Sequence, residues 1–289
     1  MQLNPKISKW FARLLSFAGL RRDTPNETKD APTIIFTLPD GRRITMEELQ
    51  GLTGSVNFRE GKLLEVTGKV RYEFIGKGSV PAAAEALHQQ ARQAGGRGDY
   101  KTAIALLVQA SDLAPAWPYP VYDRAFTHLL MEDFEGARTY YRMTLELSPR
   151  GFFTAITALD TLTREQNGDL PSGTYLAYVS LEWMQDEAEK ENAVRELVNQ
   201  IPQFAPAWKA FASLWDDDDE RLSAIEKGLA AHPDAETKGM LEINRALILN
   251  LKGDRAAAVQ LLGELALDPR STFGTEHSAK AALSILTTK

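Results

Sequence analysis

The spacing of apolar residues changes character near residue 80. Before it, apolar and polar positions alternate in short runs, most clearly over residues 69–74, and a period of two is that of a half-exposed strand. From Pro81 onward, apolar residues recur at steps of three and four, in segments separated by Gly, Pro or Asp, which indicates successive helices. The pattern therefore predicts a mainly α protein in which a small α+β unit precedes a long helical region.

The α+β unit is expected over residues 33–78. Residues 33–38 are rich in β-branched and aromatic side chains and end at Pro39-Asp40-Gly41, whose Pro and Gly favour a turn. Thr45 and Glu48 have the spacing of a capping box, which predicts a short helix ending near Gly51. The expected strands are residues 33–38, 56–58, 63–66 and 69–74. A unit this small buries little apolar area alone, so we expect it to depend on packing against the neighbouring part of the chain for its stability.

Residues 1–22 predict an amphipathic helix with a basic polar side. Its apolar positions at helical spacing are Leu3, Ile7, Trp10, Phe11, Leu14 and Ala18. One interpretation is attachment to an anionic membrane surface, with the aromatic rings at headgroup depth. The residues expected to make that contact are Lys6, Lys9, Trp10, Phe11 and Arg13. Docking onto the rest of the protein and a mitochondrial-type presequence are the alternatives, and the polar residues 23–32 are expected to be a linker.

Composition narrows the class of protein. The 289 residues are 44% hydrophobic and 25% charged, which is ordinary for a globular chain and excludes collagen, a disordered chain and a disulfide scaffold. There is no Cys, and the four His are widely spaced, so the sequence predicts neither thiol catalysis nor a metal site. The net charge is −6 while residues 1–22 are basic, so a nucleic-acid partner is not expected. No apolar run is long enough to span a membrane.

The helical region repeats itself with a period of 34 residues. The matched pairs are Asp99 and Asp133, Tyr100 and Phe134, Ala103 and Ala137, Leu107 and Tyr141, Leu113 and Leu147, and Pro115 and Pro149. Small residues at 103 and 137 let two helices approach closely, and the prolines stop the second helix of each pair. The pattern predicts helical hairpins, each of which needs a stacked neighbour to cover its apolar face.

This period, with an aromatic residue, a small residue three positions later and a closing Leu-x-Pro, resembles the tetratricopeptide repeat (TPR) of bacterial proteins. Residues 252–269 resemble a further copy of the repeat, and residues 220–233 resemble the second helix of a degenerate copy. The tetrapeptide Ala-Pro-Ala-Trp occurs at both 114–117 and 205–208. The resemblance implies a right-handed α-solenoid over residues 79–289, closed by a last helix near 275–287. Between Pro149 and Pro206 the period fails, so an irregular insertion is expected around 150–174, where the pairing of helices stays open.

The resemblance also implies where a partner would bind. In TPR proteins the first helix of each hairpin lines a concave groove that takes up a peptide or helix. The corresponding positions are Glu85, His88 and Arg92 in the first repeat, and Tyr119, Tyr122, Asp123 and Phe126 in the second. The carboxylate clamp of some TPR proteins is not matched at these positions. The aromatic residues among them have two interpretations, a recognition patch or packing between hairpins.

Two other kinds of motif resemble ligand-binding loops but lack the residues or the context that such loops require. Asp216–Glu220 resembles a calcium loop, but Arg221 and Lys227 occupy the places of its glycine and its bidentate glutamate, so helix capping is the better interpretation. The Gly-rich segments 76–79 and 95–98 lack the context of a phosphate loop.

The sequence therefore predicts a non-catalytic, cytoplasmic scaffold without a cofactor, which binds a protein or peptide in a groove. Two alternatives stay open. One is an accessory subunit or enzyme whose 33–78 unit contacts substrate, and the other is a scaffold held at a membrane surface by residues 1–22. Oligomeric state is not predicted.

Overall fold

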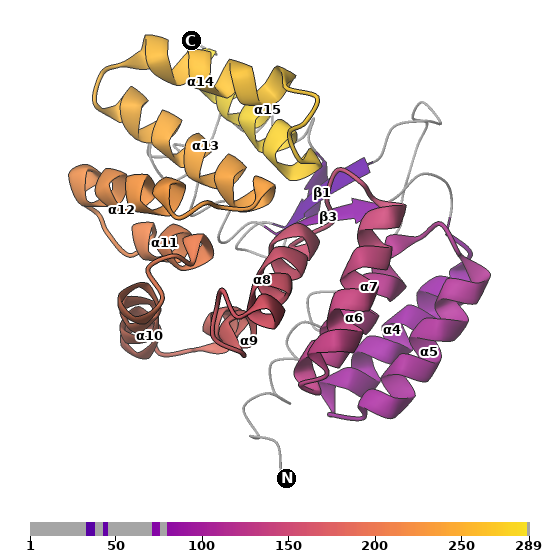
Figure 1. The fold of residues 1–289 in the computed structure, drawn as a ribbon. Helices are drawn as coiled ribbons and strands as arrows, with labels where there is room; N and C mark the ends of the chain where they lie inside the picture. The colour runs from indigo at the N-terminus through magenta and orange to yellow at the C-terminus, as the bar shows by residue number, and fades with distance from the viewer. Residues whose placement is uncertain (1–32, 38–42, 46–70, 76–79, 288–289) are drawn as a thin grey trace. The chain divides into compact units, whose positions relative to one another are not determined.

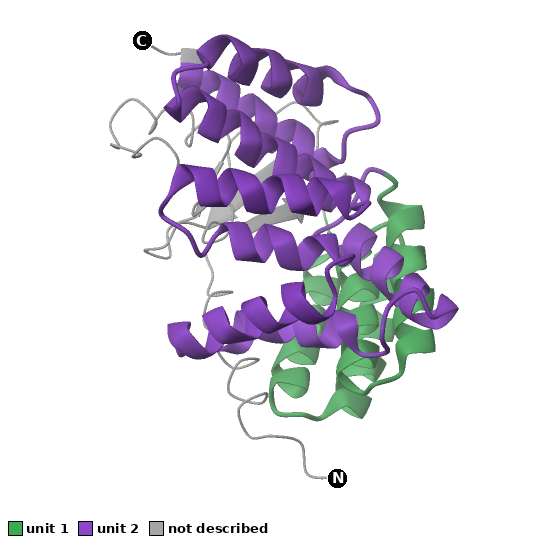
Figure 2. Ribbon diagram, turned by 60° about the vertical axis from the view of Figure 1, so that its left-hand side comes forward, with its two compact units in different colours: residues 1–33, 75–149 green, residues 34–74, 150–289 purple. Residues whose placement is uncertain are grey.

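The structure is a computed structural model, and it describes residues 33–37, 43–45, 71–75 and 80–287. The chain divides into two compact units. Unit 1 comprises residues 1–33 and 75–149, and unit 2 comprises residues 34–74 and 150–289 (Figure 2). The segments expected at 1–22 and 23–32 lie outside the described residues, as do Lys6, Lys9, Trp10, Phe11 and Arg13, so those predictions stay predictions.

Three strands form a sheet with the order β2-β1-β3. They are β1 (Thr33–Thr37), β2 (Arg43–Thr45) and β3 (Arg71–Ile75). β1 and β2 are antiparallel, with Ile35 opposite Thr45. The strands expected at 33–38 and 69–74 are thus present. β2 was not expected, and its β-branched Ile44 and Thr45 suit a strand. The expected strands 56–58 and 63–66, and the helix expected after Thr45, fall outside the described residues.

Unit 1 contains two helical hairpins. The first pairs α4 (Ala82–Gly96) with α5 (Tyr100–Leu113), and the second pairs α6 (Pro118–Leu130) with α7 (Phe134–Leu147) (Figure 1). Ala103 and Ala137, at matching places in α5 and α7, have at most 1% of their surface exposed. A small side chain at this position lets the two helices of each hairpin approach closely, as the repeat predicted.

In both hairpins the second helix also begins and ends in the same way. Asp99 accepts a hydrogen bond from the backbone N–H of Thr102 at 3.2 Å and so caps α5, while Asp133 accepts from Gly136 at 2.9 Å and caps α7. The helices end at Leu113 and Leu147, and the residues that follow, Ala114 and Ser148, have ψ angles of 71° and 76°, outside the α-helical region that a following proline disfavours. The 34-residue period is therefore a structural repeat, and the TPR-like hairpin fold is confirmed.

Unit 2 contains eight α-helices and one short 3₁₀-helix within the part of the chain that the structure describes. They are α8 (Ala155–Asn167), α9 (Thr174–Ser180), η1 (Leu181–Trp183), α10 (Glu187–Gln200), α11 (Ala205–Ala212), α12 (Asp218–Ala230), α13 (Ala235–Leu251), α14 (Arg255–Leu267) and α15 (Phe273–Thr287). Helices α11 and α12 form one hairpin, and α13 and α14 form the next. Asp254 caps α14 by accepting from Ala257 N at 3.1 Å, which repeats the caps of unit 1.

The open question of helix pairing after residue 150 is answered by Glu165. Its carboxylate accepts hydrogen bonds from the backbone N–H groups of Gly173 and Tyr175, both at 2.7 Å. These bonds tie the end of α8 to the start of α9, and the Tyr175 ring is fully buried. Helix α8 therefore pairs with α9, rather than α9 with α10. Residues 150–174, expected to be irregular, contain the regular helix α8 and the turn that follows it.

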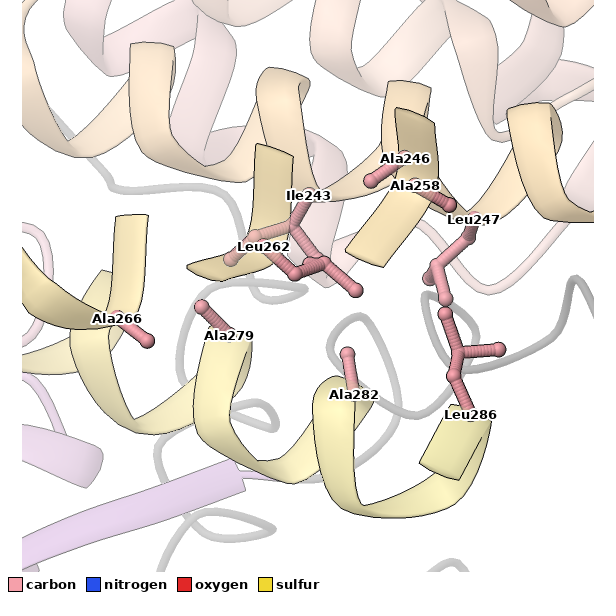
Figure 3. Close-up of a cluster of buried hydrophobic side chains, with 9 residues drawn as sticks. All are labelled: Ile243, Ala246, Leu247, Ala258, Leu262, Ala266, Ala279, Ala282 and Leu286. Carbon is pink, nitrogen blue, oxygen red and sulfur yellow. The ribbon is translucent and has the colours of Figure 1, made fainter. Parts of the chain in front are cut away.

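The last helix closes the stack as expected. α15 contacts both α13 and α14, and the three helices enclose a cluster of alanine and larger aliphatic side chains (Figure 3). Its buried members are Ile243, Ala246, Leu247, Ala258, Leu262, Ala266, Ala279, Ala282 and Leu286. A Cβ atom at Gly239 of α13 would lie 2.0 Å from the hydroxyl oxygen of Thr275 in α15, so glycine is what permits this close approach. No helix of the described residues is long and apolar enough to cross a membrane.

Candidate partner-binding surfaces

The first helices of the two hairpins in unit 1 bring five side chains together. His88 and Arg92 lie one turn apart on α4, Tyr119 and Asp123 lie one turn apart on α6, and Trp117 is the N-cap residue of α6. Residues four apart share a face of a helix. Helix α5 packs along α4 and carries the chain back, so that the next helix, α6, also lies against α4. We call this set the α4–α6 surface.

An ion pair lies at the centre of the α4–α6 surface. His88 Nε2 lies 2.7 Å from Asp123 Oδ2, and Arg92 Nε lies 3.7 Å from the same oxygen. Burial alone would raise the pKa of Asp123, but His88 and Arg92 outweigh burial and the pKa lies below its ordinary value. The carboxylate is thus held ionised. The side chains of Arg92 and Asp123 keep 19% and 21% of their surface exposed, which leaves both within reach of a partner.

Aromatic rings cover the other side of this ion pair. The His88 ring meets the rings of Trp117 and Tyr119 edge to face, with centroids 4.9 and 5.4 Å apart. His88 is 8% exposed and Tyr119 is 9% exposed, whereas Trp117 is partly exposed. The rings fix the orientation of His88 and so pre-organise the charged groups beside it.

The remaining residues expected to line the groove lie elsewhere. Tyr122 points towards the second helix of its own hairpin, where its ring centroid is 5.6 Å from that of Tyr141 in α7. Phe126 is partly buried on α6, and Glu85 is exposed in the first turn of α4. The structure therefore unites His88, Arg92, Tyr119 and Asp123. The ring contacts of Tyr119 with His88 and of Tyr122 with Tyr141 are packing contacts within unit 1. Of the two sequence-based interpretations, a recognition patch or packing between hairpins, they agree with packing.

Unit 2 holds a second polar group of residues, which the sequence analysis missed. It consists of Tyr178 on α9, Asp160 on α8, Lys209 on α11, Glu236 in the first turn of α13 and Asp234, the N-cap of α13. We call it the Lys209 cluster. Lys209 Nζ lies 5.9 Å from the centroid of the Tyr178 ring. Burial alone would lower the pKa of Lys209, but Tyr178, Glu236 and Asp234 outweigh burial and raise it above its ordinary value.

The carboxylates of the Lys209 cluster have different roles. Asp234 Oδ1 accepts hydrogen bonds from the backbone N–H groups of Glu236 and Thr237 and from the Thr157 hydroxyl, at 3.0, 3.1 and 3.0 Å. Asp234 is therefore committed to capping α13 and joining it to α8. Burial raises the pKa of Glu236 to about 8, Asp234 adds to that rise, and Lys209 opposes it. Burial and Asp234 also raise the pKa of Asp160.

The Lys209 cluster was missed because its members are scattered in the sequence and each resembles an ordinary surface charge. One signal was present. The repeated Ala-Pro-Ala-Trp marks the start of a first helix at 114–117 and again at 205–208, which places Lys209 on a first helix. The N-cap spacing of Asp234 and Thr237 likewise marks the start of α13. Neither signal reveals that the start of α13 packs against α8, or that Lys209 lies near Asp234 and Glu236.

Comparison with known proteins gives structural likeness only. No family model matches the chain, and no curated protein matches it. The chain is similar to the solved structure of MamA from Desulfovibrio magneticus RS-1, with 15% identity and a TM-score of 0.31, over 64% of this chain and 94% of that one. It is also similar to TTC0263, a thermophilic TPR protein in Thermus thermophilus, with 16% identity and a TM-score of 0.29, over 70% of this chain and 99% of that one.

These overlaps carry no functional argument, and the fold rests on the chain's own hairpins. α5 and α7 begin at aspartate caps 34 residues apart, α14 begins at a third, and each of these helices packs against the helix before it. By its repeat length, its caps and its helix pairs, the chain has a TPR-like fold.

Proposed function

We propose that the chain is a non-catalytic interaction scaffold that binds a partner protein or peptide on the first helices of its hairpins. The observation that carries this proposal is the α4–α6 surface, where Arg92 and Asp123 are fixed in place and still partly exposed. Charged groups held in one geometry lose little conformational freedom on binding, and they offer a partner both a donor and an acceptor. Trp117 adds a partly exposed aromatic ring beside them.

Binding fits the His88–Asp123 pair better than catalysis does. In a hydrolytic triad the carboxylate orients the imidazole, and the other ring nitrogen meets a nucleophilic hydroxyl. Here the rings of Trp117 and Tyr119 pack against His88, and the ring is 8% exposed. These neighbours support a role for His88 in positioning Asp123.

The experiment compares two charge reversals in unit 1. Arg92→Glu places a negative charge beside Asp123 on the α4–α6 surface, whereas Arg142→Glu makes the same change at an exposed position on α7. The purified chain and both variants are used as bait, with chemical cross-linking and mass spectrometry to identify what binds. We expect Arg92→Glu to lose the partners that the wild-type chain and Arg142→Glu retain, with the helical circular dichroism unchanged. Equal capture by all three would refute binding at the α4–α6 surface.

The two alternative roles rest on sequence alone. Attachment to a membrane surface depends on residues 1–22, and contact with a substrate depends on the 33–78 unit, most of which lies outside the described residues. A cytoplasmic location likewise stays a prediction.

A further inference from the structure

The α4–α6 surface has hydrogen-bonding capacity that unit 1 leaves unused. His88 Nε2 and Arg92 Nε both approach the same oxygen of Asp123, Oδ2, at 2.7 and 3.7 Å. The other carboxylate oxygen, Oδ1, and the two terminal nitrogens of Arg92 have no hydrogen-bond partner among the described residues, and they are not among the buried unpaired atoms of that part of the chain. These three atoms are therefore open to a partner.

The open atoms demand opposite things of a partner. A guanidinium can only donate hydrogen bonds, and an ionised carboxylate can only accept them. Asp123 is held ionised by His88 and Arg92, which lower its pKa against the effect of burial. A group that satisfies both side chains must therefore accept from Arg92 and donate to Asp123.

The charges favour a neutral group over an ion. The groups that act on the charge of Asp123 are His88 and Arg92, and the charges of Arg92 and Asp123 offset each other. A partner carboxylate drawn to Arg92 would be repelled by Asp123, and a partner ammonium drawn to Asp123 would be repelled by Arg92. Placing like charges side by side costs affinity, so the surface selects against both ions.

The geometry favours a primary amide among neutral groups. Arg92 Nε lies 3.7 Å from Asp123 Oδ2, beyond the range of about 2.7–3.2 Å for such hydrogen bonds, so two polar atoms span the pair better than one hydroxyl oxygen does. A side-chain carboxamide carries its oxygen and an N–H on the same edge. A main-chain peptide group is trans, so its oxygen and N–H point in opposite directions. The partly exposed Trp117 ring adds a flat surface for a planar group.

We propose that the α4–α6 surface recognises the side-chain carboxamide of an asparagine or a glutamine of the partner, whose oxygen accepts from Arg92 and whose nitrogen donates to Asp123. This inference rests on the proposed function, since it assumes a protein or peptide partner. It goes beyond that function by naming the chemical group that is bound.

The test uses single amino acids, each acetylated at the N-terminus and closed by an N-methylamide, so that only a side chain can supply a primary amide. The probes are the derivatives of glutamine, asparagine, glutamate, lysine, serine and alanine. Each is titrated into the full chain, into Arg92→Gln, and into Arg142→Gln, a matched change at an exposed position of α7. Binding is followed by the NMR signals of the Trp117 indole N–H and the Asp123 backbone N–H, and circular dichroism checks the fold.

We expect saturable shifts in the millimolar range with the glutamine or the asparagine derivative, in the wild-type chain and in Arg142→Gln. The tighter of the two identifies the side chain that fits. In Arg92→Gln the affinity should fall about tenfold or more, because a charged donor is lost. The other four probes should bind the wild-type chain at least about tenfold more weakly than the better carboxamide.

The proposal is overturned if no probe saturates, or if Arg92→Gln binds the carboxamides as well as the wild-type chain does. It is also overturned if another probe binds as tightly as the carboxamides. Glutamate would then indicate a carboxylate on Arg92, lysine an ammonium on Asp123, serine a hydroxyl, and alanine the main chain.

These outcomes are separate from those of the capture experiment. If Arg92→Glu loses its partners and the carboxamide probes fail, the proposed function stands and the carboxamide assignment is wrong. If all three baits capture equally while the glutamine probe saturates, binding of those partners at the α4–α6 surface is refuted although the surface holds a carboxamide.

Discussion

His88 Nε2 lies 2.7 Å from the carboxylate of Asp123, 35 residues later in the chain, and this contact joins the first helices of two successive hairpins. A separation of about one repeat is what stacking produces, since equivalent positions of neighbouring repeats become neighbours in space. The contact therefore belongs both to the stability of unit 1 and to the surface that we propose binds a partner.

Asp123→Asn should weaken unit 1. The change keeps the shape of the side chain but removes the charge that His88 and Arg92 stabilise, so we expect a loss of about 1–3 kcal/mol in the free energy of unfolding near neutral pH. The folded pKa of Asp123 lies below its ordinary value of 3.8, so its contribution is present above that pH and is lost as pH falls through the folded pKa. Urea unfolding at neutral and acidic pH measures both effects. A variant as stable as the wild-type chain at neutral pH would contradict the assignment.

Asp133→Ala should destabilise α7 through the loss of its cap. The carboxylate accepts from Gly136 N at 2.9 Å and its other oxygen lies 2.8 Å from His128 Nδ1, so we expect a cost of about 1 kcal/mol. Glu146→Ala is the control, because Glu146 is an exposed carboxylate near the other end of α7. Thermal unfolding of the two variants tests the cap. Equal melting temperatures would show that Asp133 does not stabilise the helix.

Two glycine substitutions in unit 2 should have opposite signs. Gly239→Ala forces a methyl group against Thr275, and we expect a loss of about 1–3 kcal/mol. Gly263→Ala, in α14, meets no atom within 4 Å and should stabilise the helix by up to about 1 kcal/mol. Denaturant unfolding of the pair compares one chemical change in two environments. Stabilisation by both alanines would mean that α13 and α15 are further apart than the structure places them.

Glu236 should make the stability of unit 2 fall with rising pH. Its pKa is about 8 in the folded chain against an ordinary value of 4.5, so the folded chain holds a proton that the unfolded chain has released between those values. The stabilisation is complete below the lower value and is lost as pH rises through the higher one. The charged groups that act on Glu236 are Asp234 in its own turn and Lys209 on α11, and Arg150 lines the same small cavity as Glu236. Asp160 on α8 acts on Asp234 and is paired with Arg164.

Glu236→Gln tests this directly, since glutamine does not titrate. We expect the variant to gain stability relative to the wild-type chain between about pH 5 and about pH 9, as followed by urea unfolding. A difference between the two proteins that stays constant with pH would show that Glu236 ionises normally.

The sequence predicted what depends on local pattern. The 34-residue offset that matches Asp99 with Asp133 can be recognised without coordinates, and both residues prove to be the caps of equivalent helices. The sequence did not predict which groove residues pair. Tyr122 and Asp123 are adjacent in the chain, yet one packs on α7 and the other on α4, because successive residues point about 100° apart on a helix. Glu236 and Lys209 escaped notice because their proximity depends on the packing of separate hairpins.

Hydrogen–deuterium exchange of the chain with a captured partner tests the central claim most directly. If the partner lies on the first helices, bound chain should show slower exchange in peptides from α4 and α6, around His88, Arg92 and Asp123, while α5 and α7 exchange as in the free chain. Slowed exchange confined to α5 and α7 would place the partner on the second helices and contradict the account.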